Sequence, residues 1–215
     1  MTKISMALFL MLFATLSFTT LVSDSLVAAT IVSARPVVVV LGDSLAAGYG
    51  VDKEEAFPSL LEKKFKSDHV DVKVINAGLS GSTSASGPSR MNWQLKAKPT
   101  HLLLELGGND GLRGINPRDT AESLRKTIKI ALENHITVFL LGMKAPPNYG
   151  KEFTQKFETV YINLSKEFKL ELYPFLLEGV AGDASLNQGD GIHPNAKGHQ
   201  IIADHLYNFL KGKIR

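Results

Sequence analysis

The stretch Val37-Val38-Val39-Val40-Leu41-Gly42-Asp43-Ser44 decides the fold. Its first five residues are apolar without interruption. A strand with one face in water would alternate apolar and polar residues, so this run predicts a strand covered on both faces, as in a parallel sheet. Gly42 ends the strand, and Ser44 follows at its carboxyl end, where open α/β sheets bind their ligands. The stretch therefore predicts a central strand that carries a hydroxyl in a position to do chemistry.

The rest of the chain alternates between strand-like and helix-like segments. Further strands are predicted at residues 70–75, 101–106, 137–141 and 170–175. Helices are predicted at residues 57–66, 89–97, 118–134, 154–168 and 195–210, where apolar residues recur at helical spacing. This alternation predicts one α/β domain with a five-stranded parallel sheet and helices on both faces.

Length and composition fit one soluble domain with a sizeable core. The chain has 215 residues, of which 44% are hydrophobic and 21% charged, both near globular averages. Its net charge is only +3 and the basic residues are scattered, so we expect no nucleic-acid partner. The absence of cysteine excludes disulfides, thiolate metal sites and a cysteine nucleophile. No pattern in the sequence defines an oligomeric state.

The amino terminus is typical of a targeting segment. Lys3 provides a short positive region, residues 4–22 carry no charge, and Val27-Ala28-Ala29 offers small residues for a signal peptidase. We therefore expect residues 1–29 to be a signal peptide cleaved near Ala29, which leaves residues 30–215 as a periplasmic or secreted domain. The alternative is an uncleaved membrane anchor, because the apolar segment is long for a signal peptide.

Ser44 needs a base to act as a nucleophile, because a serine hydroxyl is weakly reactive at neutral pH. The best candidate is His193, within Asp190-Gly191-Ile192-His193-Pro194. A glycine-containing turn can bring the Asp190 carboxylate to one nitrogen of the His193 ring and leave the other nitrogen for Ser44. Pro194 restricts His193 to an extended backbone and prepares the first turn of the last helix. These residues predict a nucleophile, a base and an orienting acid.

A tetrahedral intermediate also requires hydrogen-bond donors for its negative oxygen. The natural donors are the Ser44 N–H, the Gly78 N–H and the side-chain amide of Asn109, because each follows or ends a predicted strand. Glycine at position 78 would let the backbone approach a substrate closely. The sequence thus predicts an oxyanion hole at the same sheet edge.

Each motif has an ordinary structural interpretation when it is taken alone. Residues 42–44 and 107–110 could be tight turns, the latter also an anion nest, and residues 190–194 could cap the last helix. Their order and their places at strand ends favour one site. Asp43 and Asp110 have no carboxylate partner at ligand spacing, so we expect no metal and no other cofactor.

Three further polar residues are expected to be structural. Glu105 lies inside an apolar run and needs a partner, which is either Arg113 or a backbone donor. His199 and His205 lie on the last predicted helix, where we expect them to face solvent or to pack.

The four blocks together resemble the SGNH (GDSL) hydrolases. The matching residues are Gly42-Asp43-Ser44-Leu45, Gly78, Gly107-x-Asn109-Asp110 and Asp190-x-x-His193. Longer runs, such as Glu105 to Gly114 and Pro147-Asn148-Tyr149-Gly150, are similar to the periplasmic acyl-thioesterase, lysophospholipase and arylesterase subgroup. The resemblance covers the chain from residue 30 onward.

This resemblance implies a three-layer, flavodoxin-like fold with strand order 2-1-3-4-5. It implies Ser44 as nucleophile, His193 as base and Asp190 as orienting acid. It also implies an oxyanion hole formed by Ser44, Gly78 and Asn109. The loop 110–117 and the turn 144–150 would line an acyl groove, so we expect the substrate-binding residues to be Leu112, Ile115, Pro146 and Tyr149.

The sequence therefore predicts an exported serine esterase that cleaves small acyl esters or thioesters through an acyl-serine intermediate and makes transient contact with lipid surfaces. One alternative is a carbohydrate O-deacetylase or acyltransferase of the same superfamily. Another is a ligand-binding module without catalysis. The first strand is not followed by Gly-x-Gly-x-x-Gly, which disfavours a dinucleotide as the ligand of such a module.

Overall fold

The computed structural model of the chain describes residues 35–214. The predicted signal peptide, residues 1–29, lies outside the described residues. None of the helices within residues 35–214 is long and apolar enough to cross a membrane.

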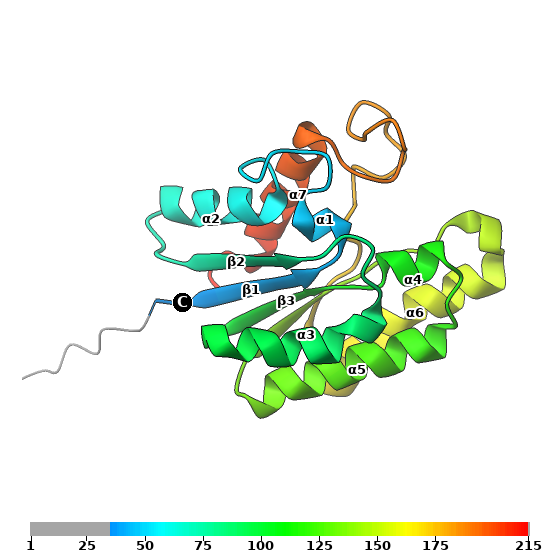
Figure 1. Cartoon of the computed structure of the whole chain (residues 1–215), viewed down its shortest axis with the longest axis horizontal. Coiled ribbons are helices and arrows are strands. Elements are labelled where there is room, and N and C mark those ends of the chain that lie inside the picture. Colours follow the sequence, from blue (N-terminus) through cyan, green and yellow to red (C-terminus); the bar gives the residue numbers. More distant parts are fainter. Residues whose placement is uncertain (1–34, 215) are drawn as a thin grey trace, which may run out of the picture. The chain divides into compact units, whose positions relative to one another are not determined.

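Five parallel strands form the sheet, in the order β2-β1-β3-β4-β5. Figure 1 shows β2, β1 and β3 side by side. Gly42, the last residue of β1, pairs with Gly78 on one side and with Glu105 on the other. β2, β1 and β3 therefore end level with one another, and the loops that follow them start at a common edge. The strand bounds are β1 Val37–Gly42, β2 Lys73–Gly78, β3 His101–Glu105, β4 Thr137–Leu141 and β5 Glu171–Tyr173.

Helices cover both faces of the sheet. On one face α2 (Phe57–Ser67) packs against α7 (Ala196–Leu210). On the other face α5 (Pro117–Glu133) lies between α3 (Gly87–Gln94) and α6 (Lys151–Phe168) (Figure 1). This arrangement is the three-layer, flavodoxin-like α/β fold, and it confirms the prediction made from the alternating segments.

The core lies on both sides of β1. Residues 38–41 have no exposed surface, which explains why the run carries no polar residue. Leu61 and Phe65 of α2 are buried at helical spacing, as are Leu206 and Leu210 of α7. Full burial of one such side chain contributes about 1.5–3 kcal/mol, so β1 is held firmly in place.

Two short helices follow strands at the carboxyl edge of the sheet. α1 (Ser44–Ala47) follows β1, and α4 (Gly108–Leu112) follows β3 in a segment for which the sequence also allowed a tight turn. Two glycines in α4 give it a low helix propensity. Buried contacts of Asp110 fix it instead, because this carboxylate accepts hydrogen bonds from the Ser84 N–H (2.8 Å) and the Thr120 hydroxyl (3.1 Å).

Some element boundaries differ from the predicted ones. β2 begins at Lys73 instead of residue 70, because the Val70 N–H donates to the Phe65 carbonyl and the chain is still leaving α2 at that point. α6 begins three residues before the predicted start, directly after the short 3-10 turn η3 (Pro147–Tyr149). The η1 (Ser84–Ser86) and η2 (Leu95–Ala97) turns flank α3 in the same way.

Candidate active site

Ser44 is the first residue of α1 and lies at the end of the central strand. Asp43 caps this helix, since its Oδ1 accepts the Leu45 N–H at 3.0 Å. Gly42 is required by space: a Cβ there would lie 2.1 Å from Oε2 of Glu105. The turn that presents Ser44 is therefore packed directly onto β3.

Arg90 of α3 ties the ends of two strands together beneath this turn. Its Nη2 donates to the Gly42 carbonyl at 2.9 Å and also to the Ala77 carbonyl. Asn76 makes a second tie, because its side-chain amide donates to the Ala46 carbonyl of α1 at 2.7 Å. β2 thus supports the helix that carries Ser44.

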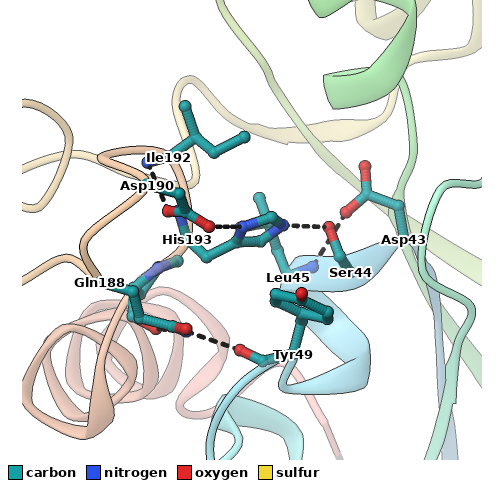
Figure 2. A network of polar contacts seen from close by, with 9 residues as sticks. Asp43, Ser44, Leu45, Tyr49, Gln188, Asp190, Ile192 and His193 are labelled. Atoms are coloured by element: carbon teal, nitrogen blue, oxygen red, sulfur yellow. Dashed lines mark hydrogen bonds and ion pairs between the residues drawn. The ribbon is translucent and has the colours of Figure 1, made fainter.

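The structure brings Ser44, His193 and Asp190 into one row (Figure 2). The Ser44 Oγ lies 2.9 Å from His193 Nε2, and His193 Nδ1 lies 2.6 Å from Asp190 Oδ2. The other Asp190 oxygen accepts the backbone N–H groups of Ile192 and His193, each at 3.0 Å. The hydrogen bond from the His193 ring, followed by these backbone bonds, lowers the pKa of Asp190 to about 2. Asp190 is therefore ionised and can orient the imidazole ring.

The three predicted oxyanion donors are not equivalent. The Ser44 N–H has no acceptor among the described residues, and Asn109 lies in the wall of the adjoining cavity while one of its N–H groups donates to Asp43 Oδ2 at 3.2 Å. The Gly78 N–H, in contrast, donates to Oδ1 of Asn76 at 2.9 Å, and Gly78 does not line the cavity. Because Gly78 has no side chain, α1 can pack closely against it: a Cβ on residue 78 would lie 2.1 Å from the Ala47 nitrogen.

Two acids are buried beneath the Ser44 turn. Glu105 has no exposed surface, and its Oε2 accepts the Asp43 N–H at 3.0 Å, while its Oε1 has no hydrogen-bond partner within residues 35–214. Of the two partners that the sequence allowed for Glu105, the structure shows the backbone donor, which is the Asp43 N–H. The other candidate, Arg113, donates to the Gly81 carbonyl. Burial, together with the nearby charge of Asp43, raises the pKa of Glu105 well above its ordinary value. Burial also raises the pKa of Asp43.

A cavity of about 450 Å³ opens beside the Ser44–His193 pair. Of the four predicted substrate-binding residues, Leu112 and Pro146 line it, whereas Ile115 and Tyr149 do not. Tyr149 instead donates its hydroxyl to the Leu112 carbonyl at 2.8 Å, and Ile115 comes after the end of α4, where the chain turns away. The wall is mostly apolar and also includes Leu45, Met143, Ala145, Pro147, Phe175, Leu177, Ala181 and Ile192.

Several residues at the site were not predicted. The Tyr49 ring lies over the His193 ring with centroids 4.7 Å apart, and Gln188 hydrogen-bonds to the Tyr49 carbonyl. Met143 and Phe175 follow the ends of β4 and β5 and line the cavity. Their positions just after apolar strands are the one sequence signal that could have identified them as site residues. His199 is buried, in agreement with the packing role considered for it, and its Nδ1 accepts the Phe57 N–H at 3.3 Å.

Within residues 35–214, no group of three or more His, Asp or Glu side chains is arranged to hold a metal ion.

A flavodoxin-like sheet that carries a Ser–His–Asp row beside an apolar cavity defines an α/β serine hydrolase. A family model described as GDSL-like Lipase/Acylhydrolase matches residues 40–201. The chain belongs to this family, and it is a hydrolase of ester or thioester bonds.

Relatives of known name agree with this assignment. Esterase TesA of Pseudomonas aeruginosa is 37% identical over 87% of this chain and 94% of its own length. Thioesterase 1/protease 1/lysophospholipase L1 of Escherichia coli strain K12 is 39% identical over 83% of this chain and 85% of its own length. Among solved structures, the psychrotrophic esterase EstA from Pseudoalteromonas sp. superposes with a TM-score of 0.79 at 33% identity and covers 82% of this chain and 97% of its own.

Proposed function

We propose that this protein is an exported serine esterase with Ser44 as nucleophile, His193 as general base and Asp190 as the acid that orients the base. The observation that carries the proposal is the continuous row from Ser44 Oγ to His193 Nε2 and from His193 Nδ1 to Asp190 Oδ2, beside an apolar cavity. It is the arrangement needed to activate a serine hydroxyl.

In the first step, Ser44 Oγ attacks the acyl carbonyl carbon and its proton passes to His193 Nε2. The carbonyl oxygen becomes negative and is stabilised by the Ser44 N–H and the Asn109 amide. The Gly78 N–H contributes only when its hydrogen bond to Asn76 is shared or broken. Each such donor is worth about 3–4 kcal/mol of transition-state stabilisation.

The intermediate then collapses, and the bond to the leaving group breaks as that group takes the proton from His193. Water attacks the acyl-serine ester and passes a proton to His193, which returns it to Ser44 Oγ as the acid product leaves. Throughout both steps Asp190 stays ionised and holds the Nδ1–H, so that Nε2 remains the nitrogen that exchanges protons.

The substrate class follows from the cavity and from the relatives. Its apolar wall suits an acyl chain, and the named relatives are esterases and a thioesterase/lysophospholipase. Exposed apolar side chains also surround the site, which supports transient contact with a lipid surface. These side chains are Tyr49, Leu79, Leu112, Tyr149 and Ile192. Export is proposed from the signal-like sequence of residues 1–29.

Ser44→Ala is the decisive variant. It should abolish hydrolysis of a short p-nitrophenyl ester and labelling by a fluorophosphonate probe, and retained activity near that of the wild type would reject Ser44. His193→Ala should lose hydrolysis of the same ester, and retained activity near that of the wild type would reject His193 as base.

A substrate panel then separates the remaining alternatives. Acyl-CoA, lysophospholipid and p-nitrophenyl esters should be hydrolysed faster than an acetylated sugar. A preference for the sugar would indicate a carbohydrate deacetylase, and transfer of the acyl group to an added alcohol in place of water would indicate an acyltransferase.

A further inference from the structure

His193 and Asp190 lie on an irregular segment, residues 174–194, that connects β5 to α7. Much of this segment is in water: Ile192 is 46% exposed, and the Asp190 side chain is 39% exposed. No strand or helix of its own holds the base at the correct distance from Ser44, so other contacts must do so.

Gln188 contacts both its own segment and the loop after the Ser44 helix. Figure 2 shows the second of these contacts, from Gln188 to Tyr49. Its Nε2 donates to the Pro194 carbonyl at 2.9 Å and to the Tyr49 carbonyl at 2.6 Å. Its backbone N–H donates to the His193 carbonyl at 2.8 Å. One half-buried side chain thus holds the residues next to the base and also reaches the loop that follows the Ser44 helix.

The Ser44 side is shaped to receive this amide. Gly50 has φ +76°, and a Cβ at that position would lie 2.0 Å from Gln188 Oε1. Among the described residues, the Gln188–Tyr49 bond and the Ser44–His193 contact are the two hydrogen bonds that join residues 44–52 to residues 174–194. If the Gln188–Tyr49 bond is removed, the Ser44–His193 contact is the one hydrogen bond left between these two ranges of described residues.

We propose that Gln188 is a positioning residue. It holds His193 in register with Ser44 by clamping residues 174–194, the base segment, to the Tyr49 carbonyl. This inference rests on the proposed function, because it assigns Gln188 a role that acts through His193. The same clamp fixes Tyr49, whose ring covers one side of the His193 imidazole. Gln188 does not line the cavity and makes no contact that a substrate would need.

The test variant is Gln188→Leu, which keeps the bulk of the side chain but removes both donated hydrogen bonds. We expect kcat for a p-nitrophenyl ester to fall about 100-fold, the loss that misplacing a catalytic group by roughly 1 Å can cause. KM should stay within about threefold, because the cavity wall is unchanged. The matched control is Gln200→Leu on α7. Its amide hydrogen-bonds, among the described residues, to the exposed Asp204 alone, and kcat of this variant should equal that of the wild type.

A double-mutant cycle with His193→Ala separates positioning from a general structural role. If Gln188 acts through His193, Gln188→Leu has no further effect on the residual rate of His193→Ala. An additional loss of the same size in that background, or wild-type kcat in the single variant, would overturn the inference. Gln188→Glu provides a second variant if the leucine variant does not fold: it keeps the shape but sets a carboxylate against two carbonyl oxygens, and wild-type kcat in it would count equally against the clamp.

The failure of this inference can be distinguished from failure of the proposed function. If Ser44→Ala and His193→Ala lose activity while Gln188→Leu does not, only the clamp is wrong. If Ser44→Ala remains active, the proposed function is wrong and the clamp falls with it.

Discussion

The two halves of the Ser44–His193 pair are built in opposite ways. Ser44 follows a strand whose residues 38–41 are fully buried, and the acid beneath it, Glu105, has no exposed surface. His193 lies on a loop in which the acid that supports it, Asp190, keeps 39% of its side chain exposed. One half is fixed by packing, and the other is fixed by a few hydrogen bonds.

The two acids show what this difference does to charge. Hydrogen bonds from His193 and from backbone N–H groups lower the pKa of Asp190 to about 2, whereas burial raises the pKa of Glu105 well above its ordinary value. An ionised acid therefore lies where it can support a proton-carrying imidazole, and an acid whose protonated form is favoured by burial lies where a charge would be costly. Changing each acid should break one half of the pair in its own way.

Asp190→Asn should have the largest effect. The amide can keep accepting the Ile192 and His193 N–H groups, so the loop should stay folded. It no longer favours the imidazole tautomer with its proton on Nδ1, and the corresponding change in another triad lowers kcat about 10⁴-fold. We expect a loss of about 10³–10⁴-fold in kcat for a p-nitrophenyl ester with a melting temperature close to that of the wild type.

Asp183→Asn is the control for this variant, because Asp183 also accepts local hydrogen bonds in the same segment but does not contact His193. It should leave kcat unchanged. Equal losses in the two variants would mean that Asp190 only maintains the loop.

Glu105→Leu should break the packed half. It leaves the buried Asp43 N–H without its acceptor, which costs about 1–3 kcal/mol of folding free energy. The turn that carries Ser44 should shift, and we expect kcat to fall about 10–100-fold. Glu105→Gln keeps a neutral acceptor of the same shape, so its kcat should remain within about threefold of the wild type. Denaturation by urea and steady-state kinetics measure the two effects.

The pH dependence of stability tests whether Glu105 is neutral. Because its pKa is raised in the folded chain, the folded state keeps a proton that the unfolded state releases, and stability falls as the pH rises above about 4.5. Glutamine does not titrate, so the advantage of Glu105→Gln over the wild type should grow with pH. Glu122→Gln, at an exposed ion pair with Lys126, should show no such growth, and parallel curves for the two variants would contradict a neutral Glu105.

The packed half of the site could be predicted from the sequence to a large extent. The apolar run before Gly42 indicated a buried parallel strand, and equal strand ends brought Ser44 and Asn109 to one edge. Asp190 and His193 were found because their spacing of three residues fits a turn. In all of these cases the signal is local or follows from the regular geometry of a sheet.

The remaining features depend on contacts between distant residues, which no local pattern reveals. Gln188 hydrogen-bonds to Tyr49, 139 positions away in the sequence, and no motif around either residue predicts this contact. The side chain of Asn76 accepts the N–H of Gly78 and also donates to the Ala46 carbonyl of α1, 30 positions away, and this second contact has no local signal. Tyr149 was expected in the cavity wall for its apolar ring, but its hydroxyl holds the Leu112 carbonyl from outside.

His199 joins the two halves, and changing it should have the smallest effect. His199 lies on α7, which follows the base segment. Its ring accepts the N–H of Phe57, the first residue of α2. The N-cap residue of α2, Ala56, provides no side-chain hydrogen bond of its own. Burial lowers the pKa of His199 to about 4. As the pH falls, His199 takes up a proton in the unfolded chain before it does so in the folded chain. Its contribution to the free energy of unfolding is complete at pH 7 and is lost between about pH 6.5 and pH 4. The loss is at most about 3 kcal/mol.

His199→Leu should remove this dependence and cost about 1 kcal/mol at pH 7, because the Phe57 N–H loses its acceptor. The free energy of unfolding of the variant should then change less than that of the wild type between pH 7 and pH 4.5, and the two curves should approach each other or cross. His69→Asn is the matched control, since His69 is exposed and its positive φ of 60° suits asparagine. If His199→Leu loses stability in acid as steeply as His69→Asn, the acid sensitivity belongs to other groups.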